Sequence, residues 1–319
     1  MRIYRHAREL APEHKGAVIA IGNFDGVHRG HRAVIDEAGR IAREHGTPWG
    51  VLTFEPHPRM MFTPETPPFR ITPFVDKARI VEEMGVDFML VLHFDETLSR
   101  MPADEFVRQI LVDGIGTRHI VSGFDFVFGH QRAGTAQFLE AEGRKYGFGA
   151  TGAGKVVDEE GKVISSTRIR EYLAEGKPRE AARLIGRPFE LAGRVSGGDQ
   201  RGRTIGFPTA NLMLATTTQP AFGVYAVRAG IETEKGTVWH DGVANLGYRP
   251  TFGGTSPVLE THIFDFADDI YGKHLRVALI EFLRPERKFD GIVSLTAQIK
   301  VDSDQARALL VPGKDKDQN

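Results

Sequence analysis

The sequence predicts an amino-terminal α/β domain built on a parallel sheet, followed by a carboxyl-terminal antiparallel β-barrel. Its 319 residues exceed the roughly 100–200 residues of one typical domain. Short apolar runs alternate with helical patterns in the first half, which is typical of βαβ units. Runs rich in β-branched and aromatic residues, separated by Gly and Asp turns, fill the second half and favour antiparallel strands.

The first half begins with an apolar run at residues 17–21 that is closed by Gly22. Apolar residues then recur at helical spacing up to Gly46, so we expect a strand, a loop and a helix. We expect further strands in WGVLTF, VDFMLVLHF and RHIVSG, and further helices in DKARIVEEMG and PADEFVRQILVDG. Because parallel sheets bind ligands outside the carboxyl ends of their strands, the loop after Ile21 is the expected ligand site.

Two short helices are predicted in STRIREYLAEGKPREAARLIG, after which the pattern changes. From Phe189 onward we expect strands in FELAGRV, GVYAVRAG, TVWHDGVANLG, LETHIFDF and LRVALIEFL. A last helix is a candidate in GIVSLTAQIKVDSDQARALL. We therefore predict one domain over residues 1–184, a second over 185–312 and a flexible tail over 313–319.

Composition excludes several classes of protein. The chain has 41 Lys and Arg against 42 Asp and Glu, and it has no long block of one sign, so nothing indicates a nucleic-acid or anionic-membrane surface. The absence of cysteine excludes disulfides and thiolate chemistry and suits a reducing compartment. No stretch approaches the roughly 20 apolar residues of a membrane span, and the charged amino terminus does not resemble a signal peptide. We expect a soluble, cytoplasmic protein.

The stretch GNFDGVHRGH places two histidines where a helix begins. Backbone N–H groups at a helix start carry about half a positive charge, so phosphate binds there readily. Gly26 and Gly30 let the backbone approach an anion closely, while His28 and His31 can face the same side of the first turn. The two imidazoles could donate hydrogen bonds to phosphate oxygens. Two other interpretations of His28 and His31 stay open: they could be half of a metal site, or they could be ordinary surface histidines.

This stretch resembles the G-x-F-D-x-x-H-x-G-H signature of the nucleotidyltransferase superfamily, whose H-x-G-H element contacts a nucleoside triphosphate. FEPHP, SGFDFVFG and ISSTRIR then follow in the order found in the adenylyltransferase half of bacterial bifunctional FAD synthetases. The resemblance implies a Rossmann-like domain that transfers AMP from ATP to FMN and releases pyrophosphate. Such a transfer needs no covalent enzyme intermediate, so positioning and charge stabilisation do most of the catalysis.

The resemblance also implies roles for individual residues. It implies catalytic roles for His28, His31 and Arg170, binding of ATP or phosphate by Gly22, Phe24, Asp25, Gly30, Ser166 and Thr167, and flavin contacts by His57, Asp125 and Phe126. Hydroxyl and backbone donors at a helix start, together with a guanidinium, make a clamp for anions. Three roles for Asp25 stay open: orienting the histidines, helping to hold Mg²⁺, and shaping the turn.

A second glycine-rich stretch, GATGAGK at residues 149–155, fits the phosphate-loop pattern G-x-x-x-x-G-K. Val156, however, stands where that loop needs a hydroxyl to bind Mg²⁺. The residues that follow predict a hairpin around Glu160 and Gly161, where the loop would need a helix. We therefore do not expect a phosphate-binding loop here.

The stretch GGDQRGRTIGFPTANL carries the strongest signal in the second half. Thr209 and Asn211 are two apart, so an extended segment places both side chains on one side. The stretch resembles the G-R-x-x-G-F-P-T-A-N signature of riboflavin kinases, and GVYAV, ANLGYRPTFGG, LETHIFDF and DDIYG follow in that family's order. The resemblance implies that Gly202, Arg203 and Thr209 bind ATP. It also implies that Thr209 and Asn211 hold Mg²⁺ and that Glu260 is the base for the ribityl hydroxyl.

The two resemblances cover both halves of the chain. They imply a bifunctional enzyme that phosphorylates riboflavin to FMN and then adenylylates FMN to FAD, with Mg²⁺ as cofactor, ATP as co-substrate, and ADP and pyrophosphate as products. Two alternatives stay open: an enzyme that keeps only one activity, and a sensor that binds flavin and nucleotide without turnover. A base at Glu260 and histidines at positions 28 and 31 favour the enzyme, since binding alone needs neither. We expect no nucleic-acid or membrane partner, and self-association stays open.

Overall fold

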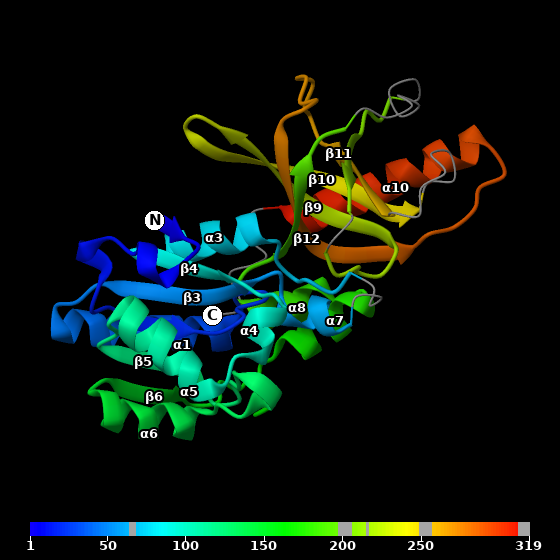
Figure 1. Ribbon diagram of the computed structural model, residues 1–319. Coiled ribbons are helices and arrows are strands. Elements are labelled where there is room, and N and C mark those ends of the chain that lie inside the picture. The colour runs from blue at the N-terminus through cyan, green and yellow to red at the C-terminus, as the bar shows by residue number, and fades with distance from the viewer. Residues whose placement is uncertain (64–67, 197–205, 215–216, 249–256, 312–319) are drawn as a thin grey trace. The chain divides into compact units, whose positions relative to one another are not determined.

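The computed structural model describes residues 1–63, 68–196, 206–214, 217–248 and 257–311 (Figure 1). The chain divides into two compact units, Met1–Ser166 and Thr167–Asn319. The first unit contains a parallel sheet with helices and the second contains an antiparallel sheet. The predicted fold class of each half is thereby confirmed.

The first unit is built on a six-stranded parallel sheet with the strand order β1-β4-β3-β2-β5-β6. Its strands are β1 (Arg2–Tyr4), β2 (Val18–Ile21), β3 (Trp49–Glu55), β4 (Phe88–His93), β5 (His119–Gly123) and β6 (Gly149–Ala153). From β2 the chain adds β3 and β4 on one side, then crosses over and adds β5 and β6 on the other. The strand order therefore reverses beside β2, and this is where such sheets open a ligand crevice outside the carboxyl ends of their strands.

Helices cover both faces of this sheet. Helices α1 (Arg29–His45) and α3 (Phe74–Glu83) bury apolar side chains against one face. Helix α5 (Ala103–Phe106), the π-type helix η3 (Val107–Ile115) that continues it, and α6 (Ala136–Tyr146) bury theirs against the other. The result is a three-layer arrangement that leaves the ends of the strands open to ligands.

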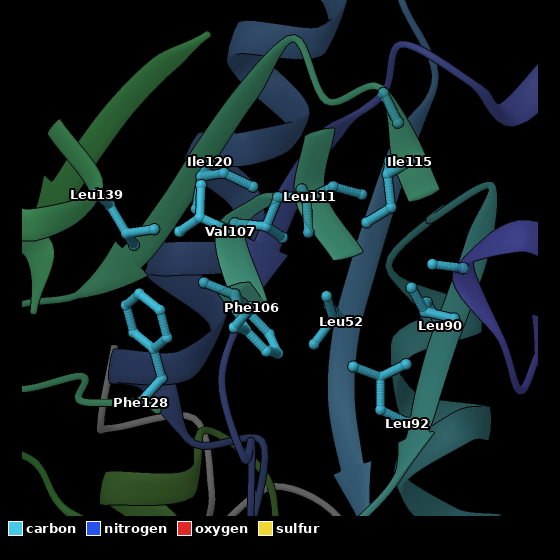
Figure 2. Close-up of a cluster of buried hydrophobic side chains, with 14 of the residues drawn as sticks. Leu52, Leu90, Leu92, Phe106, Val107, Leu111, Ile115, Ile120, Phe128 and Leu139 are labelled. Atoms are coloured by element: carbon cyan, nitrogen blue, oxygen red, sulfur yellow. The ribbon is translucent and has the colours of Figure 1, made fainter. Parts of the chain in front are cut away.

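Two apolar cores hold these layers together. Figure 2 shows one of them, in which Phe106, Leu111 and Ile115 from the α5–η3 helix lie near Leu52 and Leu90 from the sheet. Val51, which precedes Leu52 on β3, belongs to the core on the opposite face, because successive side chains of a strand point to opposite sides. Strands that are buried on both faces explain the continuous apolar runs in the sequence.

Short helical segments complete the first unit: η1 (Ala7–Glu9), η2 (Pro12–His14), α2 (Pro58–Phe62), α4 (Glu96–Arg100) and η4 (His130–Arg132). The sequence pattern did not identify these segments, nor β1, β6 and α6. Helix α6 carries Gly143 in its interior, which weakens the helical signal. That glycine is required by packing, because a Cβ there would lie 2.4 Å from the carbonyl oxygen of Phe148.

The second unit is built on a curled antiparallel sheet with the strand order β7-β12-β9-β10-β11-β8. Its strands are β7 (Phe189–Arg194), β8 (Ala210–Met213), β9 (Gly223–Thr233), β10 (Gly236–Tyr248), β11 (Pro257–Ile263) and β12 (His274–Pro285). Its two edge strands approach each other where Ser196, just after β7, donates its backbone N–H to the carbonyl of Asn211 on β8 at 3.0 Å. The sheet thus curls towards the expected barrel.

Within the described ranges, the second sheet is accompanied by helices α7 (Ser166–Ala174), α8 (Pro178–Ile185) and α10 (Ile292–Leu310). Helix α8 packs against β7 and β12, and α10 packs against β9, β10 and β12. The predicted pair of short helices and the candidate last helix are confirmed. An ion pair fixes α10 to the sheet, with Arg284 on β12 only 2.7 Å from the carboxylate of the buried Asp302.

The two compact units meet in sequence after Ser166, so α7 and α8 belong to the second unit. The boundary between residues 184 and 185 stays a prediction, and cutting the chain tests it. The expected tail at residues 313–319 lies outside the described residues. Among the helices of the described ranges, none has the length and apolar character needed to cross a membrane.

Candidate active sites

His28 and His31 form a stacked pair at the start of α1. His28 is the N-cap residue, and its Nδ1 accepts the backbone N–H of His31 at 3.3 Å. The two rings are stacked, with centroids 3.6 Å apart and planes inclined by 17°. The prediction that both histidines face the same side of the first turn is confirmed. Because Nδ1 of His28 accepts a hydrogen bond, a neutral His28 carries its proton on Nε2.

The loop that presents this pair has a strained backbone. Phe24 and Val27 have φ angles of 51° and 40°, a left-handed conformation that costs residues other than glycine about 1–2 kcal/mol each. Both side chains are buried, and the Phe24 ring meets the His31 ring edge-on at 5.5 Å. Such strain persists only where the surroundings determine the conformation, and it is characteristic of functional loops.

Gly22 and Gly30 pack closely against aromatic rings around this loop. A Cβ on Gly22 would lie 3.0 Å from the ring of Phe24, and a Cβ on Gly30 would lie 3.2 Å from the ring of His28. The glycine between the two histidines therefore leaves room for the His28 ring. The predicted phosphate-binding glycines thus have a packing role in addition to the one implied by the resemblance.

Asp25 is buried and is engaged by two segments distant in sequence. Its Oδ1 accepts the backbone N–H groups of Ile71 at 2.9 Å and of Thr72 at 3.2 Å, just before α3. Its backbone carbonyl accepts the hydroxyl of Ser166 at 2.9 Å. Of the three roles that the sequence left open for Asp25, these contacts support the shaping of the loop. They also bring Ser166 to the loop that follows β2.

The other predicted residues of the first site follow neighbouring strands. His57 comes just after β3 and is the N-cap of α2, where its Nδ1 accepts the backbone N–H of Arg59 at 3.1 Å. Asp125 and Phe126 come just after β5, in a turn where Phe126 donates its N–H to the carbonyl of Gly123 at 3.1 Å. Since the carboxyl ends of parallel strands meet at one edge of a sheet, these residues share an edge with the loop after β2.

Thr167 and Arg170 lie on α7, within the second compact unit. They therefore differ from the other residues predicted for the first site, which all lie in Met1–Ser166. Their proposed contact with phosphate stays a prediction.

Lys77 is a buried polar residue beside this site that the sequence reasoning missed. Its Nζ lies 3.0 Å from the carbonyl oxygen of Asn23 and 3.3 Å from Oε1 of Glu55, whose other oxygen is 2.6 Å from Arg70. Burial lowers the pKa of the Lys77 ammonium, and the charges of Glu55 and Asp25 oppose that shift. Helical spacing is the signal that could have revealed it, since Ile80 and Val81 follow at positions i+3 and i+4 and are buried.

The second unit contains a cavity of about 240 Å³ at one end of its sheet. The residues that line it come from the position just after β7, from β8 and the segment before it, and from β11 and the segment after it: Val195, Pro208, Thr209, Ala210, Thr261, Ile263, Phe266, Ala267, Asp268, Asp269, Ile270 and Tyr271. Thr209 is the predicted site residue among them. Gly202 and Arg203 lie outside the described residues.

Asn211 and Glu260 stand directly opposite each other on β8 and β11. On the other side of Glu260, its partner in the register is Asn245 of β10. Because residues directly opposite in an antiparallel pair share a face, the three polar residues form a row across three strands. Asn245 donates its side-chain amide to Glu286 at 3.2 Å. The sequence reasoning missed Asn245, although it lies within the ANLGYRPTFGG stretch that carried the resemblance.

The rejected phosphate loop forms a strand and a hairpin. Residues 149–153 are β6, and Val157 pairs with Val163 across a turn in which Gly161 has a φ of 74°. The predicted hairpin is confirmed, and no helix follows Lys155 in this fully described segment. The ammonium of Lys155 lies 5.1 Å from the centre of the Phe124 ring.

Comparison with known proteins gives the same division of the chain into two parts. The FAD synthetase family matches residues 10–168 and the riboflavin kinase family matches residues 185–310. The bifunctional riboflavin kinase/FMN adenylyltransferase of Pseudomonas fluorescens is 43% identical over 313 residues, which cover 98% of this chain and 99% of that protein. The protein of the same name from Escherichia coli (strain K12) is 41% identical over 302 residues, 95% of each chain.

A solved structure resembles the whole chain. The crystal structure titled as a macrolide-efflux protein from Streptococcus pneumoniae is 33% identical, with a TM-score of 0.83 over 96% of this chain and 98% of that one. The similarity extends across both compact units. With both families matched in this order and curated relatives aligned almost from end to end, the chain belongs to the family of bifunctional riboflavin kinase/FMN adenylyltransferases.

Proposed function

We propose that this chain converts riboflavin to FMN and FMN to FAD, each step consuming one ATP. The observation that carries the proposal is the presence of two separate sites: a histidine pair at the helix start beside β2, and a carboxylate between two asparagines on the second sheet. The first suits transfer of an adenylyl group and the second suits phosphorylation of an alcohol. Phosphorylation of riboflavin releases ADP, and adenylylation of FMN releases pyrophosphate.

For adenylyl transfer, a phosphate oxygen of FMN attacks the α-phosphorus of ATP, and the electrons of the broken bond leave with pyrophosphate. His28 and His31 donate hydrogen bonds to phosphate oxygens whose negative charge grows during this step. The backbone N–H groups at the start of α1 add to the same stabilisation.

The other predicted residues complete this site in the proposal. Gly22, Phe24, Asp25 and Gly30 shape the loop that receives ATP, Ser166, Thr167 and Arg170 hold its phosphates, and His57, Asp125 and Phe126 contact the flavin. The position of His57, Asp125 and Phe126 at the carboxyl ends of β3 and β5 supports a flavin beside the nucleotide.

For riboflavin phosphorylation, the terminal ribityl hydroxyl attacks the γ-phosphorus of ATP and ADP leaves. The carboxylate of Glu260 accepts the hydroxyl proton as the new bond forms, a contribution worth about 10²–10⁴-fold. Asn211 and Asn245 stand opposite Glu260 on either side, which favours one orientation of its side chain. Thr209 at the edge of the cavity contacts ATP, together with Gly202 and Arg203.

Mg²⁺ fits the residues of the second site. The hydroxyl of Thr209 and the side-chain carbonyl of the buried Asn211 are oxygen donors, which hard divalent cations prefer. We propose that these two residues hold Mg²⁺ with the phosphates of ATP. When bound, Mg²⁺ neutralises the charge that develops on those phosphates. We also propose a cytoplasmic location, which suits a chain without cysteine that needs ATP for both steps.

The test is an assay of the pure protein with both flavins. Riboflavin with Mg-ATP should give FMN and then FAD, and supplied FMN should give FAD directly, as followed by chromatography of the flavins. Conversion that stops at FMN would favour the alternative with one activity, and bound but unchanged riboflavin would favour the sensor. A chelator should stop riboflavin phosphorylation, and added Mg²⁺ should restore it; full activity in excess chelator would contradict the proposed metal.

A further inference from the structure

The buried ammonium of Lys77 forms an unusual contact with the loop that presents the two histidines. Lys77 on α3 is 2% exposed, and burying a lysine is unfavourable unless strong contacts compensate for the lost water. Here Nζ donates to the backbone carbonyl of Asn23 at 3.0 Å and to the carboxylate of Glu55 at 3.3 Å. The first of these acceptors lies in the loop between β2 and α1.

The Asn23 carbonyl is held from two sides. Thr53 on β3, which is fully buried, donates its hydroxyl to the same oxygen at 3.2 Å. This carbonyl belongs to the peptide unit that joins Asn23 to Phe24, the residue with a φ of 51°. Fixing that peptide plane therefore favours the left-handed conformation of Phe24.

Phe24 transmits this constraint to the histidine pair. Its buried ring meets the ring of His31 edge-on at 5.5 Å, and His31 stacks on His28. If Phe24 left its left-handed conformation, its ring would move away from the ring of His31, and the orientation of both imidazoles would change. A chain of contacts thus runs from the ammonium of Lys77 through the Asn23 carbonyl and the Phe24 ring to the predicted catalytic residues.

Contacts around Lys77 that do not involve its ammonium also stabilise this part of the first unit. Glu55 is also paired with Arg70, with the two groups 2.6 Å apart. Asp25 independently fastens the same loop to the segment before α3 through the N–H groups of Ile71 and Thr72. Loss of the Lys77 ammonium therefore leaves the unit folded but removes one of the two donors that hold the Asn23 carbonyl.

We propose that Lys77 is a positioning residue for adenylyl transfer, which holds the Asn23 carbonyl and thereby orients His28 and His31. The inference rests on the proposed role of these histidines. Lys77 itself does not touch the substrates in this proposal, so its loss lowers the rate of the chemical step and leaves substrate affinity almost unchanged.

The test replaces Lys77 with Met, which keeps the length and apolar body of the side chain and removes the ammonium. With FMN and Mg-ATP, K77M should lose about 10–100-fold in kcat for FAD formation, while KM for FMN and ATP stays within about 3-fold. Riboflavin phosphorylation should stay at the parent value, and K77M should stay folded at the assay temperature. The matched control is K145M, because Lys145 pairs with Glu142 on the exposed surface of α6; it should leave both reactions unchanged.

A double-mutant cycle tests the route through the histidines. Because the route from Lys77 reaches His28 only through His31, the K77M/H31A protein should be no slower than H31A alone. If the fold-losses in kcat of the two single variants multiply in the double variant, the inference is overturned. A K77M protein with the parent kcat would overturn it as well. Equal loss of both activities with a lowered midpoint would show a merely structural role and overturn it too.

A second variant decides the case if K77M does not fold. T53V removes the other donor to the Asn23 carbonyl without touching a charge, and it should lower kcat for FAD formation in the same direction by a smaller factor. A parent kcat in T53V would then overturn the inference. If H28A makes FAD at the parent rate, the proposed role of His28 is wrong, and this inference fails with it. If H28A is slow in FAD formation and K77M is not, this inference alone fails.

Discussion

The imidazole rings of His28 and His31 lie face to face, with centroids 3.6 Å apart, at the first turn of α1. The stacking aligns two potential hydrogen-bond donors at a helix start, where backbone N–H groups already attract phosphate. We therefore predict that H28A or H31A lowers adenylyl transfer from ATP to FMN by about 10²-fold or more, as loss of one charge-stabilising donor does. Riboflavin phosphorylation should continue. Either variant making FAD at the parent rate would remove that histidine from the mechanism.

The second prediction concerns Glu260, which stands between Asn211 and Asn245 in the register of the second sheet. E260Q keeps the shape of the side chain but cannot accept the hydroxyl proton. FMN formation from riboflavin should fall by about 10²–10⁴-fold. Formation of FAD from supplied FMN should continue, which serves as the internal control for folding. Unchanged kinase turnover would exclude Glu260 as the base.

The third prediction concerns Lys155, in the stretch that matches the phosphate-loop pattern. Its ammonium lies over the Phe124 ring and the stretch before it is a strand, so K155A should leave both reactions nearly intact. Kinetic assays with limiting ATP are the relevant measurement. Loss of ATP binding in a folded K155A protein would reinstate the phosphate loop.

The fourth prediction concerns the separation of the two activities by cutting the chain. A fragment of residues 185–319 should convert riboflavin to FMN and stop, while residues 1–184 should make FAD only when given FMN. Because α8 buries Leu184 and Ile185 and packs against β7 and β12, a fragment of residues 167–319 should unfold at a higher temperature than 185–319. Circular dichroism and flavin chromatography compare the fragments.

Two outcomes would contradict the fourth prediction. A folded carboxyl-terminal fragment without kinase activity would show that the kinase site needs the first half of the chain. Equal midpoints for the two carboxyl-terminal fragments would show that α7 and α8 do not stabilise the second unit.

The fifth prediction follows from the lowered pKa of Lys77. Between that lowered pKa and the ordinary lysine pKa of 10.5, the unfolded chain binds the proton more than the folded chain does, so the stability contributed by this site rises with pH in that window. The free energy of unfolding of the parent should therefore rise relative to that of K77M as the pH rises towards the ordinary lysine pKa of 10.5. Denaturant titrations at several pH values measure this difference. Parallel curves for the two proteins would contradict the shift.

Much of the fold followed from local pattern. Continuous apolar runs such as residues 88–92 predicted strands buried on both faces, and the glycine after His45 adopts the left-handed conformation that ends α1. Strands or helices with weak local signals were missed. Strand β6 has the composition GATGA, and it forms because β5 offers it a backbone edge.

The sequence by itself determined the order of the two fold types and the identity of the motif residues, because both depend on residue types at fixed spacing along the chain. Only the tertiary structure decided that Lys77 of α3 holds the Asn23 carbonyl, and that Asn245 completes the polar row beside Glu260. The partners in the first contact are 54 residues apart in sequence. Such contacts depend on the crossover order of the strands and on the register of their pairing, which no local pattern specifies.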